Sequence, residues 1–224
     1  MPADQSAAGS TGPSIMTPDL VVVREPDSDG AQAYRSVRET IRHARSDPPV
    51  RSVLLADAGS RDQAGEVIAN VGASFALNGS PTVLVDADGS NPSLHRLLNT
   101  PLSPGLIERL SSGSANPLST AVASLSVIPV GTRADSTVLP LADLLSDETC
   151  QQLVTELTSS ARYVLFNATV APVSSEALTI AANVDAVLLL VRSSVTRRTD
   201  AQRARESLER VGANILGAVL TDSR

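Results

Sequence analysis

The feature that most constrains the fold is an alternation of apolar runs with amphipathic segments along most of the chain. The apolar runs are continuous rather than alternating, which is typical of parallel strands that are covered on both faces. They lie at 52–56, 82–86, 125–130, 163–167, 186–192 and 214–220. Helical patterns separate them near 64–78, 146–160, 174–183 and 196–211. The sequence therefore predicts an α/β domain with a mostly parallel central sheet, helices on both faces, and ligands at the carboxyl ends of the strands.

The amino-terminal part of the chain is less regular. Residues 1–18 are rich in Pro, Ser, Gly and Ala, so we expect a disordered lead there, followed by one domain over 19–224. The short apolar segment DLVVV at 19–23 is strand-like. From about 30 to 46, apolar residues recur at three- and four-residue steps, which predicts an amphipathic helix.

Composition argues against several classes of function. All 18 basic residues are arginines, so the chain has no lysine for a phosphate-binding loop or a Schiff base. The net charge of -6 argues against a non-specific nucleic-acid binder, which needs a basic face. No apolar run approaches the roughly 18–20 residues that span a bilayer, and the chain begins without a secretory signal pattern. We therefore expect a cytoplasmic protein with no transmembrane segment of its own, in which the single Cys150 packs on a helix.

The most specific stretch is VLVDADGSNPSLHRLL at 83–98. A buried strand ends in Asp86 and Asp88, which places two carboxylates on one side of the strand, at the edge where α/β folds bind ligands. They would then organise Mg²⁺ or its waters. The alternative is structural, with Asp88 capping the turn and Pro92 starting a short helix. Spacing alone does not decide between the two interpretations.

A second stretch, VLLADAGSRDQAGEVIANVGASFA at 53–76, has the order of a phosphate-binding loop: an apolar run, a small polar loop, then a helical pattern. No G-K-[ST] is present in it. The segment predicts the shape of a nucleotide site without the residues that hold a nucleotide.

These stretches resemble the cytoplasmic P-loop domain of bacterial tyrosine kinases (BY-kinases). The resemblance runs in order over about 19–222, through AYRSVRETIRHA, VLVDAD, NPSLHRLL, LSVIPVGT and VDAVLLLVRSSVTRRTDAQRARESLERVGANILGAVLTD. It implies a three-layer P-loop NTPase-like fold. It also implies an ATP-dependent tyrosine kinase that works with a membrane polysaccharide co-polymerase in capsule and exopolysaccharide export.

Several family residues are replaced in this chain. The resemblance aligns the phosphate-loop lysine with Ala64 and the metal-binding hydroxyl with Gly65, and Glu66 adds a carboxylate where phosphate would bind. It therefore implies a degenerate loop made of Gly59, Arg61, Gln63, Ala64, Gly65 and Glu66.

The second acidic strand of the family is altered as well. Its metal-facing aspartate becomes Asn167, and the later acidic position is Glu176. We expect these residues to be vestigial together with Asp86 and Asp88, because the lysine, the hydroxyl and the second aspartate serve separate parts of phosphoryl transfer.

The family's ring-forming contact, E-x-x-R-x-x-R, becomes Gln32, Arg35 and Arg38. In a helix these side chains share one face, so we expect an outward-facing interface that supports weak self-association at most. The implied partner is a membrane co-polymerase or an active BY-kinase homologue, with the chain peripheral at the inner face of the membrane.

Two functions from different classes remain open. The first is a non-catalytic regulatory or scaffolding relative of the kinase domain, with no cofactor. The second is a divergent kinase or ATPase that binds ATP and Mg²⁺ through Asp86, Asp88 and Glu176, with a lysine or arginine supplied in trans by another chain. A more distant alternative is a relative of the Min/Par positioning ATPases, which share the strand-loop-helix and DAD region.

Overall fold

The computed structural model describes residues 18–59, 64–113, 115–135, 137–170 and 174–222. Within them, seven strands form one sheet in the order β3-β4-β2-β5-β1-β6-β7. The strands are β1 Ser52–Asp57, β2 Thr82–Asp86, β3 Leu118–Ser119, β4 Leu125–Ile128, β5 Tyr163–Thr169, β6 Ala186–Arg192 and β7 Ile215–Thr221. All neighbouring strands are parallel except β3 and β4, which are antiparallel. The predicted mostly parallel sheet is confirmed.

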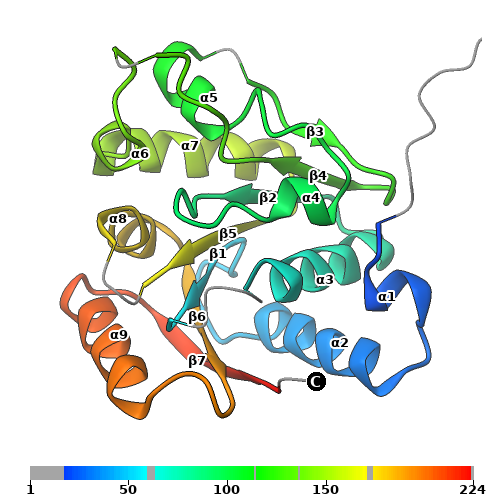
Figure 1. Ribbon diagram of the computed structural model, residues 1–224. Helices are drawn as coiled ribbons and strands as arrows, with labels where there is room; N and C mark the ends of the chain where they lie inside the picture. Colours follow the sequence, from blue (N-terminus) through cyan, green and yellow to red (C-terminus); the bar gives the residue numbers. More distant parts are fainter. Residues whose placement is uncertain (1–17, 60–63, 114, 136, 171–173, 223–224) are drawn as a thin grey trace, which may run out of the picture.

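Helices cover both faces of this sheet (Figure 1). One face carries α1 Val21–Arg24, α2 Asp29–Arg42, α3 Ala64–Leu77 and α4 Leu94–Leu97. The other carries α5 Leu106–Ser112, α6 Leu141–Leu144, α7 Asp147–Ser160, α8 Ser175–Asn183 and α9 Arg198–Arg210. Each face has its own apolar cluster, so the architecture is the expected three-layer α/β arrangement.

The strands explain why their sequence reads as continuous apolar runs. All residues of β1 and β2 are buried, because helices cover the sheet on both sides. The longer helices begin at caps that the sequence supplies. The Ser28 side chain accepts a hydrogen bond from Ala31 N at the start of α2, and Ser174 accepts one from Ala177 N at the start of α8.

The amino-terminal segment differs from its prediction. The run at 19–23 is not a strand, because Val21–Arg24 form the single helical turn α1. This turn is fixed by tertiary contacts: Val22 is buried, and its backbone N–H donates to Asn70 Oδ1 of α3 at 3.2 Å. Four apolar residues are too few for periodicity to separate a strand from a helical turn. The predicted disordered lead lies outside the described residues, except for Pro18.

Within the described ranges, none of the helices combines the length and hydropathy that a membrane crossing requires.

Candidate functional site

The candidate site lies where β1, β2 and β5 end side by side. Because the sheet order places β5 between β2 and β1, the register sets Asp86 beside Asn167 and Asp57 beside Thr169. Asp57 and Asp86 are fully buried, and Asn167 is 1% exposed. Residues from three distant parts of the chain therefore meet at the edge where ligands bind in parallel α/β folds.

The Asp86 carboxylate is fully engaged by hydrogen bonds within the protein. Its Oδ2 accepts from the backbone N–H groups of Ser93 and Leu94, at 2.9 and 3.1 Å. Its Oδ1 accepts from Asn167 Nδ2 at 2.8 Å and from the N–H of Asp88 at 3.3 Å. Four donors occupy the four lone-pair sites of this carboxylate. Burial raises the pKa of Asp86, although these hydrogen bonds oppose the shift.

Asn167 interacts directly with the Asp86 carboxylate, which it could not do as an aspartate unless a metal ion lay between the two carboxylates. An aspartate 2.8 Å from Asp86 would repel it, whereas the amide of Asn167 donates directly to that carboxylate. The exchange of an acid for an amide therefore stabilises this edge without a cation. The other amide atom, Asn167 Oδ1, is buried and has no hydrogen-bond partner among the described residues.

Asp88 serves the turn that follows β2. Its Oδ1 accepts from the N–H groups of Ser90 and Asn91, each at 3.0 Å. Its Oδ2 accepts from Thr169 Oγ1 at 2.6 Å. Asp88 therefore caps the turn as the structural alternative predicted, but the short helix that follows begins at Leu94 and not at Pro92. Thr169 was not predicted to bind Asp88, although its position two residues after Asn167 places both side chains on the same side of β5.

The start of α3 is shaped by a contact that sequence reasoning did not identify. A Cβ at Gly65 would lie 1.9 Å from Ser93 Oγ and 2.9 Å from Ser93 Cβ. Ser93 is held there because its own N–H donates to Asp86. The space that a hydroxyl side chain at position 65 would need is therefore filled by Ser93, and Gly65 is the residue that permits this packing.

The other predicted loop residues are less informative. Gly59 has a φ of 106°, and its N–H donates to Asp57 Oδ1 at 3.0 Å. Ala64 and Glu66 lie in the first turn of α3. The predicted positions Arg61 and Gln63 are outside the described residues.

Glu176 belongs to the first turn of α8, and its Oε2 accepts a hydrogen bond from the neighbouring Ser175 Oγ at 3.3 Å. No group of three or more His, Cys, Asp or Glu side chains is placed to hold a metal ion in the described part of the chain. Asp86 and Asp88, the two carboxylates predicted to bind Mg²⁺, accept hydrogen bonds from the backbone around them.

The described residues of this edge, which leave out 60–63 of the predicted loop, do not fit a nucleotide with Mg²⁺. The hydroxyl that would bind the metal cannot stand at Gly65 while Ser93 keeps its place. Asp86 has no lone pair left for a metal-bound water. The chain also contains no lysine for the phosphates. We therefore derive no catalytic step at this edge.

The predicted interface residues on α2 lie together but are not equally exposed. Gln32, Arg35 and Arg38 line one shallow pocket along the helix. Gln32 is exposed, and Arg35 donates to Pro26 O. Arg38 is turned inward: its side chain is 14% exposed and donates to Ser74 O at 3.0 Å. The expectation of an outward-facing arginine pair does not hold for Arg38, because the last turn of α3 offers it a carbonyl partner.

The architecture and this edge define a P-loop NTPase-like domain: a parallel sheet in which β1 is followed by a loop and the buried helix α3. Solved structures agree. The kinase domain of Escherichia coli tyrosine kinase ETK superposes with a TM-score of 0.82 at 21% identity, over 91% of this chain and 80% of that one. The Pyrococcus furiosus cell division ATPase MinD gives a TM-score of 0.60 at 19% identity, over 76% of this chain and 71% of that one.

The curated relatives of this chain include bacterial tyrosine kinases. Tyrosine-protein kinase YwqD of Bacillus subtilis (strain 168) is 25% identical over 211 residues, which are 94% of this chain and 89% of YwqD. The succinoglycan biosynthesis transport protein ExoP of Rhizobium meliloti (strain 1021) is 25% identical over 207 residues, which cover 89% of this chain and 26% of ExoP. No protein-family model matches the chain.

Proposed function

We propose that this protein is a non-catalytic, regulatory or scaffolding relative of the tyrosine-kinase domain of capsular and exopolysaccharide systems. The observation that carries the proposal is the contact between Ser93 and Gly65, which fills the place of the metal-binding hydroxyl. We further propose a cytoplasmic location, peripheral to the membrane through a partner. That partner is a membrane polysaccharide co-polymerase or an active homologous kinase, in keeping with the likeness to ExoP.

Three independent changes support the loss of catalysis. On the family resemblance, each of them removes a group that would bind nucleotide or metal. Gly65 stands in place of the hydroxyl and packs against Ser93. Asn167 stands in place of an aspartate and donates to Asp86, and Ala64 stands in place of the phosphate-loop lysine. One such replacement would be repaired by a single substitution, whereas all three must be reversed to rebuild a phosphoryl-transfer site.

A divergent ATP-binding kinase or ATPase is the second candidate. It is favoured by Asn167 Oδ1, a buried acceptor without a partner among the described residues, because such an atom is costly unless a ligand or water donates to it. The Min/Par alternative has less support, since the likeness to MinD covers less of the chain at a lower TM-score than the likeness to ETK.

Calorimetric titration with MgATP and with MgADP separates these functions. We expect no binding heat at micromolar protein concentrations. A dissociation constant of about 10 μM or tighter for either nucleotide would refute the non-catalytic assignment. As a second measurement, incubation with MgATP should give no phosphotyrosine on Tyr34 or Tyr163. Labelling of either tyrosine that disappears in Asp86→Asn would establish the divergent kinase instead.

A further inference from the structure

A groove of about 910 Å³ runs beside α2 and reaches Glu66 in the first turn of α3. It lies between the α1–α2 connection, the first turn of α3 and the carboxyl end of β7, which Figure 1 shows beside α2. Its apolar lining comes from α2, α3 and β7 and includes Tyr34, Val37, Val67 and Val219. The groove therefore joins the end of a strand to an apolar hollow.

The strand that borders this groove is an open edge. β7 is the last strand of the sheet and pairs only with β6 among the described residues. The N–H of Ser193 donates to Thr221 O at 2.7 Å, so the backbone of Thr221 faces β6. Because backbone groups alternate along a strand, those of Ala218 and Leu220 face the open side.

Natural proteins protect an open edge with charges, proline or a covering segment. The sequence of β7, ILGAVLT, contains neither a charge nor a proline, and Leu220 is 74% exposed. An apolar edge strand of this kind is the surface to which an extended segment adds as a further strand.

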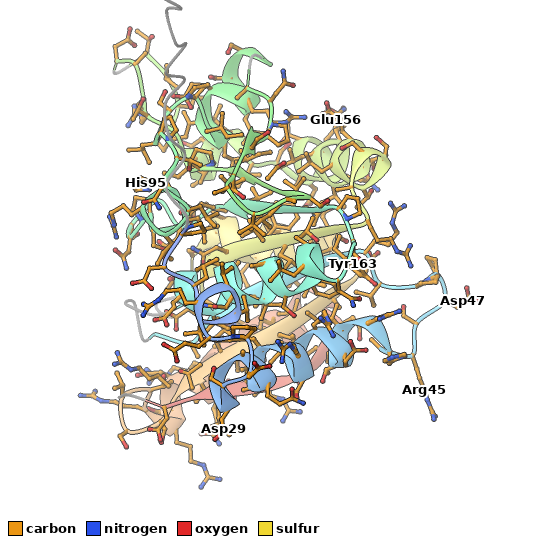
Figure 2. All side chains as sticks on the ribbon, turned by 90° about the vertical axis from the view of Figure 1, so that its right-hand side faces the viewer. Asp29, Arg45, Asp47, His95, Glu156 and Tyr163 are labelled. Carbon is orange, nitrogen blue, oxygen red and sulfur yellow. The ribbon has the colours of Figure 1, made fainter. Side chains whose placement is uncertain are left out.

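The rim of the groove specifies the charge of that segment. Five acidic residues line it and no described lining residue is basic; they are Glu25, Asp27, Asp29, Glu66 and Asp222. Asp27, Asp29 and Asp222 are exposed, and none of them forms an ion pair within the described ranges. Figure 2 shows Asp29 projecting from one end of α2, with Arg45 far away beyond the other end. These three carboxylates thus face solvent without an arginine partner among the described residues, whereas Glu25 lies 3.8 Å from Arg24.

We propose that the open edge of β7 and this groove bind an extended segment of a partner protein, which adds a strand to β7 and sets arginine or lysine side chains against the acidic rim. A second copy of the chain does not suit the rim, since its own edge strand, ILGAVLT, carries no basic residue and Asp222 follows it directly. An anionic membrane surface would be repelled by the same carboxylates. The proposal rests on the proposed function only in taking the partner to be a protein.

A labelled heptapeptide in which arginine and valine alternate tests the proposal by fluorescence anisotropy. We expect saturable micromolar binding to the full chain, weaker at higher salt, and no binding of a twin peptide with glutamate in place of arginine. The variant Asp27→Asn/Asp29→Asn/Asp222→Asn should bind the peptide at least about tenfold more weakly. The matched control, Asp143→Asn/Glu148→Gln/Glu206→Gln, removes three exposed carboxylates elsewhere and should bind like the wild type.

Backbone pairing is tested separately with proline. Leu220→Pro removes an N–H that faces the open side, which an edge strand tolerates. It should weaken binding at least about tenfold while Leu220→Thr does not, because pairing supplies the main-chain part of the affinity. Ala218→Pro replaces it as the test if Leu220→Pro lowers the melting temperature.

Three results would overturn the proposal: no saturable peptide binding, equal weakening in the control triple variant, or full affinity in both proline variants. Sedimentation that shows a dimer displaced by the peptide would assign the edge to a second copy instead. None of these peptide-binding experiments contains MgATP. Nucleotide binding found by calorimetry would therefore refute the proposed function without changing the result for peptide binding at β7.

Discussion

Replacing Gly65 with alanine should destabilise the protein, because the added methyl group meets Ser93. The new Cβ would lie 1.9 Å from Ser93 Oγ, far inside the separation of about 3.5 Å at which non-bonded atoms attract. Relieving such an overlap costs about 1–3 kcal/mol. Alanine regains about 0.5–1 kcal/mol over glycine in a helix. The net loss in the free energy of unfolding should therefore lie between about 0 and 2.5 kcal/mol, with a central value of about 1 kcal/mol.

Urea unfolding followed by circular dichroism measures this loss in a double-mutant cycle. Gly65→Ala should cost stability in the wild type and little in a Ser93→Gly background, where both overlapping atoms are gone. Gly89→Ala is the control, since a Cβ there meets nothing within 4 Å. The steric account fails if Gly65→Ala is as stable as the wild type, or if Ser93→Gly does not reduce its cost.

Three further outcomes are expected. Arg38→Glu should lower the free energy of unfolding by about 2 kcal/mol, because the charged hydrogen bond to Ser74 O is lost. Arg45→Glu, in the exposed segment after α2, should change that free energy by less than about 0.5 kcal/mol. Urea unfolding measures both values. Burial raises the pKa of Cys150 to about 12, so the native thiol should not react with a disulfide reagent at pH 8 and should react in urea. Burial favours the neutral form of Glu108, but hydrogen bonds from Ser103, Thr132 and Gly105 outweigh it and lower the pKa below 4.5. The loss in the free energy of unfolding caused by Glu108→Gln should therefore be largest at neutral pH. It should shrink as the pH falls through the pKa of Glu108 in the folded protein. An equal loss at pH 7 and pH 3 would contradict this.

The fold was predictable because its strands are buried on both faces. β1, β2 and β6 each appear in the sequence as an unbroken apolar run, and their bounds agree with the prediction to within one residue. The exceptions are short elements. The helical turn α1 depends on Asn70 and on burial against α3, and α4 on Asp86, so neither carries a periodic signal of its own.

The candidate site was predictable only in part. The unbroken apolar run of β2 and its polar end placed Asp86 and Asp88 at the correct edge. The contact of Ser93 with Gly65 was not predictable, because it joins two helices whose relative position follows from packing and not from spacing. Arg38 was misjudged for a similar reason, since its partner is a carbonyl 36 residues away. Sequence patterns locate side chains on elements, whereas tertiary contacts decide what they touch.

The order of the strands has a consequence for how the protein is made. β1 is an interior strand of the sheet, yet both of its neighbours, β5 and β6, follow it by more than a hundred residues along the chain. During synthesis, six residues that are buried in the finished protein must wait without a partner until Tyr163–Thr169 leaves the ribosome. A fragment that stops before Tyr163 should therefore aggregate instead of forming half of the sheet. The protein can fold only after most of its chain has been translated.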